Sequence, residues 1–191
     1  MLFLRTTDAD AKSHGGFQWP REVGAVVEAP DWSPEPKCGN GLHGLLDGLG
    51  ESSHLSFNPG AIWWIVDADD AVYLDGKWKF QRCTVLDFGP RHEITARLHA
   101  LRPGPIHGLC MTGGDHATLT GGYHATLTGG YRATLTGGYR ATLTGGDHAT
   151  LIFLRWADGR RRVLAAYVGE DGIEPGTPYR ANDNHTAVVS A

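Results

Sequence analysis

Residues 113–152 read GGDHATLT, GGYHATLT, GGYRATLT, GGYRATLT and GGDHATLI, five consecutive octapeptides that decide the architecture of this part of the chain. In each copy Ala-Thr-Leu-Thr alternates small or apolar residues with hydroxylated ones. This alternation predicts a strand with Ala and Leu on one face and both Thr residues on the other. The Gly-Gly pair predicts the tight turn between successive strands, so one octapeptide is expected to form one strand and one corner.

The length of the repeat predicts how the copies stack. Eight residues are too few to close one turn of a solenoid, so we expect two octapeptides per coil, with copies one, three and five in one sheet and copies two and four in the other. Tyr123 is then expected to lie over Tyr139. The expected inner ladder comprises Leu119, Leu127, Leu135, Leu143 and Leu151. So short a stack has open strand edges, so it needs caps at its ends.

The segment before the repeats is predicted to be strand-rich α+β. The apolar, β-branched and aromatic run 61–66 is its clearest strand, and Asp75-Gly76 indicates a hairpin turn. Residues 90–101 predict the one helix, with an apolar stripe of Ile94, Leu98 and Leu101. Further strands are expected at 1–6, 71–74, 78–81 and 83–88, and strand pieces at Phe17, Trp19 and 23–27. The stretch 30–60 is expected to be mostly irregular loop.

After the repeats, Ala157-Asp158-Gly159 indicates a hairpin between strands at 151–156 and 162–168. The chain beyond Gly169 is interpreted as loop. The predicted organisation is an N-terminal α+β domain (1–105), a short octapeptide-repeat β-solenoid (106–152), a capping β-hairpin (153–180) and a flexible tail (181–191). The fold class is therefore strand-rich α+β with a capped β-solenoid.

Composition limits the partners and the location. The chain has 191 residues, 41% of them hydrophobic and 20% charged, as is ordinary for a folded protein. A net charge of −4 gives no basic surface for nucleic acid or an anionic membrane, so neither is an expected partner. The three widely spaced cysteines fit a reducing compartment. The N-terminal stretch does not have the pattern of a secretory signal, and a cytoplasmic location is the prediction.

One local cluster could carry chemistry. Cys38-Gly-Asn-Gly-Leu-His43 places a thiol and an imidazole five residues apart in a Gly-rich turn. Such a pair could act as nucleophile and base, or contribute to a metal site. The alternative is a tight turn with a buried Cys and a hydrogen-bonded His, which the lack of a CxxC or HxxxH motif favours. No metal, cofactor or catalytic residue is therefore assigned, and Cys38 and His43 are kept as candidates.

The glycine, tyrosine and Thr-x-Thr positions of GGYRATLT resemble the octapeptide units of bacterial ice nucleation proteins. The resemblance implies a β-solenoid whose outward Thr-x-Thr ranks order water. The last copy departs from the pattern, because it ends in Thr150-Leu-Ile152. The matching positions, taken as candidate binding residues, are Thr118, Thr120, Thr126, Thr128, Thr134, Thr136, Thr142 and Thr144.

The flanking segments resemble a second family. FLRTTDAD, GGFQWP, EAPDWSPEPKCGNGLHGLL, YLDGKWKF and RWADGRRRVLAAYVGEDGIEPGTPYRA are similar to uncharacterised proteins of bacterial and bacteriophage genomes. Members of that family often carry glycine- and threonine-rich octapeptide arrays at this point in the chain. The resemblance implies a bacterial or phage origin and identifies no reaction.

These observations predict a non-enzymatic binding or structural module. One alternative is a small enzyme with its site around Cys38 and His43, and another is a weak ice-binding or water-ordering surface on the Thr rows. If copies of the chain associate, the expected contacts are the solenoid faces or Tyr123, Tyr131 and Tyr139.

Overall fold

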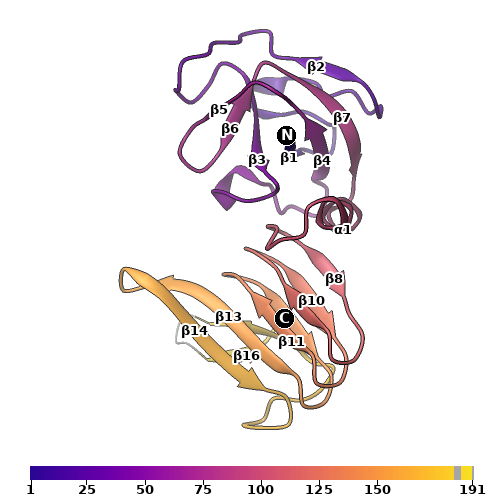
Figure 1. The fold of residues 1–191 in the computed structure, drawn as a ribbon, viewed down its shortest axis with the longest axis vertical. Helices are drawn as coiled ribbons and strands as arrows, with labels where there is room; N and C mark the ends of the chain where they lie inside the picture. The colour runs from indigo at the N-terminus through magenta and orange to yellow at the C-terminus, as the bar shows by residue number, and fades with distance from the viewer. Residues whose placement is uncertain (183–185, 191) are drawn as a thin grey trace. The chain divides into compact units, whose positions relative to one another are not determined.

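The computed structural model describes residues 1–182 and 186–190 and divides the chain into two compact units, Met1–Pro103 and Gly104–Ala191 (Figure 1). Both units are rich in strands, and α1 (Arg91–Leu101) is the one α-helix of the described residues. The coarse prediction of a strand-rich fold with a single helix is therefore confirmed.

The first unit is built on a seven-stranded antiparallel sheet with the strand order β2-β7-β4-β1-β3-β6-β5. The strands are β1 (Leu2–Thr7), β2 (Val26–Glu28), β3 (Leu42–Leu46), β4 (Ile62–Asp67), β5 (Ala71–Tyr73), β6 (Trp78–Phe80) and β7 (Arg82–Gly89). Two 3-10 turns, η1 (His14–Gly16) and η2 (Ser52–His54), lie in the connections. Most strand neighbours are far apart in sequence, so the sheet depends on many different long-range contacts.

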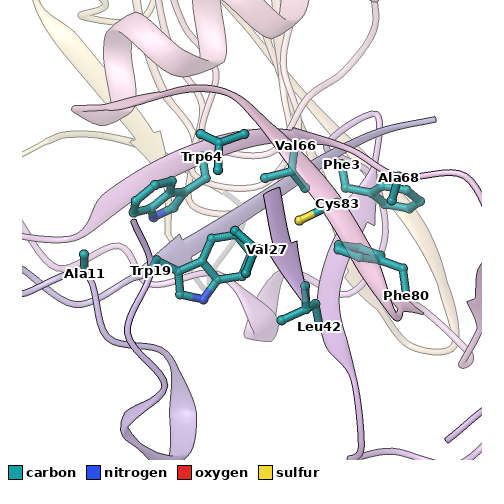
Figure 2. Close-up of a cluster of buried hydrophobic side chains, with 11 residues drawn as sticks. Phe3, Ala11, Trp19, Val27, Leu42, Trp64, Val66, Ala68, Phe80 and Cys83 are labelled. Atoms are coloured by element: carbon teal, nitrogen blue, oxygen red, sulfur yellow. The ribbon is translucent and has the colours of Figure 1, made fainter. Parts of the chain in front are cut away.

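The core of this unit is aromatic. Trp64 and Trp19 lie with their ring centroids 5.5 Å apart, and Phe3 lies 4.9 Å from Phe80; Figure 2 shows these side chains gathered in one cluster. The Trp64 indole Nε1 donates a hydrogen bond to Thr7 Oγ1 at 3.0 Å, which satisfies a buried polar group. α1 packs against β4 and β7 and buries Ile94 and Leu98.

Two local predictions for the first unit were wrong, and a third was incomplete. Leu101 is 46% exposed and does not belong to the buried helix stripe. Phe17 and Trp19 lie outside any strand, on either side of Gln18, which forms an isolated bridge with Lys12. The stretch 30–60 is mostly irregular, as expected, but it also contains β3, which pairs with β1 and β6. Gly44 lies inside that strand. A glycine is needed at this position because a Cβ would lie 2.9 Å from the Cβ of Phe3.

The second unit has two sheets formed around the repeats. A five-stranded sheet has the order β16-β15-β12-β10-β8, and a four-stranded sheet has the order β14-β13-β11-β9. The strands are β8 (Cys110–Thr112), β9 (Thr118–Thr120), β10 (Thr126–Gly129), β11 (Thr134–Gly137), β12 (Thr142–Gly145), β13 (Thr150–Ala157), β14 (Arg160–Tyr167), β15 (Pro178–Ala181) and β16 (Ala187–Val189).

Alternate copies of the octapeptide pair in parallel, as the repeat length predicts. β10 pairs with β12, so that Leu127 lies beside Leu143, and β11 pairs with both β9 and β13. Leu127, Leu135, Leu143 and Leu151 are fully buried, and Leu119 in the edge strand β9 is only partly buried. Tyr123 and Tyr139 lie 5.9 Å apart between ring centroids, which confirms the expected stacking.

The Gly-Gly pair has a different role from the predicted one. The turn falls on the two residues after it, where the amide of Ala125 donates to the carbonyl of Gly122 and His124 adopts φ +56°. The fourth residue of every copy has a positive φ, whereas the repeat glycines do not. The glycines instead allow close approach: a Cβ at Gly138 would lie 2.7 Å from the carbonyl carbon of Gly122.

Antiparallel strands cover the last repeat in each sheet. β14 pairs with β13 along its whole length through the predicted turn at Asp158-Gly159, and β15 pairs with β12. β13 runs across the expected boundary at residue 152. The interpretation of the chain beyond Gly169 as loop was wrong at β15 and β16. The predicted flexible tail includes residues 183–185 and 191, which lie outside the described residues.

Candidate functional site

The first unit contains a cavity of about 690 Å³ beside β1 and β3. Its wall includes both candidates from the sequence, Cys38 and His43, together with three residues that sequence reasoning missed, Arg5, His54 and Lys77. A volume of this size is typical of pockets that bind small molecules. The structure therefore brings Cys38 and His43 to one cavity, although it does not pair them.

The partner of the Cys38 thiol is a lysine. Lys77 Nζ lies 3.0 Å from Cys38 Sγ, and within the described residues no hydrogen bond joins Cys38 to His43. The hydrogen bond from Lys77 lowers the pKa of the exposed Cys38 thiol, because the ammonium stabilises the thiolate. Lys77 follows the Asp75-Gly76 turn, and only the pairing of β6 with β3 brings this hairpin beside the cavity.

His43 lies within β3 rather than in a turn, opposite Lys79 of β6. Burial lowers the pKa of His43 to about 4, with further contributions from the nearby cations Lys77 and Arg5. The imidazole is therefore neutral near pH 7. Its Nε2 atom is buried and has no hydrogen-bond partner among the described residues.

Arg5 is the most deeply buried charged group of the cavity wall. Its side chain lies on β1 with the guanidinium carbon 3.6 Å from the centroid of the Trp19 ring, and the residue is 8% exposed. Burial lowers the pKa of Arg5 to about 9. Its Nε is buried without a hydrogen-bond partner, and no carboxylate of the described residues forms an ion pair with it.

The candidate Thr residues of the repeats lie in parallel ranks. Thr126 pairs with Thr142, Thr128 with Thr144, and Thr134 with Thr118 and Thr150. Each Thr lies on the face of its strand opposite the buried Leu. The ranks are short, because other residues replace Thr at their ends: Cys110 precedes Thr126, and Ile152 follows Thr136. Arg180 Nε also donates to Thr142 Oγ1 at 2.7 Å.

The corners of the repeats carry rings and charges. Tyr131 lies between His116 and His148, each at 5.8 Å between ring centroids, and Arg132 lies over the Tyr131 ring. In the first copy Asp115 occupies the position of the repeat tyrosines, and its Oδ1 accepts a hydrogen bond from the Tyr131 amide at 2.8 Å. Among the described residues, no group of three His, Cys, Asp or Glu side chains could hold a metal ion.

The chain is a tandem-repeat protein: a strand-rich unit with one helix is followed by a unit built from octapeptide repeats. Residues 1–97 match the family described as "Domain of unknown function (DUF7666)". The chain belongs to this family, which confirms the predicted resemblance to uncharacterised proteins.

Curated relatives share the repeat resemblance. The chain is 38% identical over 95 residues to the ice nucleation protein InaU of Pantoea ananas, an alignment that covers 48% of this chain and 9% of the relative. It is 39% identical over 104 residues to an ice nucleation protein of Pseudomonas syringae, covering 50% of this chain and 9% of that protein. The resemblance is thus confirmed, and the chain spans less than a tenth of the length of these relatives.

No solved structure matches the chain. The helices of the described residues are all too short or too polar to cross a membrane.

Proposed function

We propose that this protein is a non-enzymatic structural and binding module of bacterial or phage origin, in which the octapeptides form a short β-solenoid with two copies per coil. The carrying observation is the parallel, in-register pairing of alternate copies, such as Leu127 with Leu143 and Leu135 with Leu151. This pairing gives the module regular ranks of identical side chains. The outward Thr ranks and the Tyr, His and Arg corners are its proposed contact surface.

A pair of deletions tests the solenoid. Removing residues 121–136 takes out copies two and three, so the remaining copies keep their places in the two sheets. Removing residues 129–136 alone takes out copy three and would exchange the sheets of all later strands. We expect the first variant to unfold cooperatively in urea and the second to lose cooperative unfolding. Equal behaviour of the two variants would contradict two copies per coil.

The binding role is tested at the contact surface. The relatives are ice nucleation proteins, and the Thr ranks are in register, so water ordering is the second candidate function. Because each rank holds at most three Thr, about 10 Å in length, we expect only weak inhibition of ice recrystallisation. Thr128→Lys, in the middle of a rank, should abolish that inhibition, whereas Thr186→Lys, outside the ranks, should leave it unchanged. Equal inhibition by the unmodified chain and Thr128→Lys would reject this candidate.

The small-enzyme alternative depends on Cys38 and His43. Turnover that disappears in both Cys38→Ala and His43→Ala, with retained folding, would replace the non-enzymatic proposal. Cys38 contacts Lys77 rather than His43, so the two candidates do not form the nucleophile–base pair on which this alternative rests.

A further inference from the structure

The cavity of the first unit has an excess of positive charge. Arg5 and Lys77 are its cations, and Asp31 is the one acidic residue of the lining, whereas His43 is neutral near pH 7 and adds no charge. Lys79 lies just behind, where its Nζ donates to the carbonyl of Lys37 at 2.9 Å. The field inside the cavity is therefore that of an anion-binding site.

The buried Arg5 guanidinium lacks the negatively charged partner that such a group ordinarily has. A guanidinium loses strong hydration on burial, so a buried arginine ordinarily has a carboxylate partner or several hydrogen bonds. Stacking on Trp19 satisfies only the face of the group. Its planar set of donors is suited to the oxygens of a carboxylate or phosphate.

We propose that this cavity binds a small organic oxyanion, a carboxylate or phosphate ester, through Arg5 and Lys77. The neutral His43 also lines the cavity. The cavity volume exceeds that of a bare oxyanion, so the remainder of the ligand lies against apolar wall residues such as Phe17 and Leu42. This inference is independent of the proposal for the repeats, which concerns the other unit.

Cys38 provides the readout, because it lines the cavity and is exposed. The rate of Cys38 alkylation by iodoacetamide is measured on the full chain by mass spectrometry, with inorganic phosphate or acetate added at constant ionic strength against chloride. Cys110, in the second unit, is the internal reference. We expect at least one anion to slow Cys38 alkylation about fivefold near saturation at millimolar concentrations, without an effect on Cys110. Protection by only one of the two anions would identify the preferred class of oxyanion, phosphate or carboxylate.

A matched pair of variants assigns the protection to the cavity. Lys77→Gln should reduce the protection because it removes one of the two cations that bind the anion. Since Lys77 also activates the thiol, protection in each variant is expressed relative to the alkylation rate of that variant without anion. Lys37→Gln removes the same charge at an exposed position outside the lining and should keep full protection. Absence of protection by both anions up to about 20 mM, or equal protection in the two variants, would overturn the proposal.

Discussion

The two units solve the same packing problem in opposite ways. The first unit brings together strands that are distant in sequence and fills its core with different large side chains, such as Trp19, Trp64 and Phe80. The second unit repeats one solution five times and fills its interior with Ala and Leu, while glycines allow the backbones to approach. The non-repetitive first unit can therefore contain a cavity with a buried cation, whereas the repeats of the second unit produce ranks of identical residues.

The largest expected effect separates the aromatic core from the exposed rings. Trp64→Ala should destabilise the first unit by about 4 kcal/mol, because it removes a fully buried indole, its stacking on Phe88 and its hydrogen bond to Thr7. Trp156→Ala, at a side chain that is 72% exposed, should change stability by less than about 0.5 kcal/mol. Urea unfolding followed by circular dichroism measures both. Similar losses in the two variants would contradict a core centred on Trp64.

The second prediction compares equivalent glycines of two repeats. Gly138→Ala should destabilise the second unit by about 3 kcal/mol, because the new Cβ would meet the backbone of Gly122. Gly114 has the same place in the first copy, where nothing lies within 4 Å of a Cβ, so Gly114→Ala should be neutral or slightly stabilising. Amide hydrogen exchange in β10 and β12 reports the difference. A neutral Gly138→Ala would show that stacking does not require the glycine.

The smallest of the three effects concerns pH and the first unit. The folded-state pKa of His43 is about 4, below the ordinary value of 6.5, so the unfolded chain binds a proton first as the pH falls. The free energy of unfolding should therefore decrease between pH 6.5 and 4, by about 2 kcal/mol after allowance for solvent screening of a half-buried group.

His43→Gln should remove this contribution and flatten the pH profile. Urea midpoints at pH 7 and pH 4.5 measure the change, with His92→Gln, at an exposed position on α1, as the control. The prediction fails if the two variants lose stability equally on acidification.

Much of the fold could be predicted where a local signal decides the structure. The apolar run of β4, the helix α1 and the turns at Asp75-Gly76 and Asp158-Gly159 have this character. β3 was missed because Gly44 weakens the local pattern, and its reason lies in the approach of Phe3, a distant residue. The role of the repeat glycines was misinterpreted for a similar reason, because the close contact that requires a glycine comes from another copy of the repeat.

The candidate site was only partly predictable. The spacing of Cys38 and His43 found two residues of the cavity wall. Arg5 and Lys77 carry no local signal, because β1 and the β5–β6 hairpin reach β3 only through long-range sheet pairing. A buried arginine without a carboxylate cannot be recognised until its neighbours are known.

The alternation of copies between two sheets also limits how such genes can change. Recombination between near-identical repeats can gain or lose a single copy, yet the strands that follow the array, β14 and β15, each pair with a strand of a particular sheet. A lineage that gains a single copy would present those strands to the wrong partners, and selection would remove it. We therefore expect arrays between flanks of this kind to vary in steps of two copies and to keep the odd parity seen in this chain.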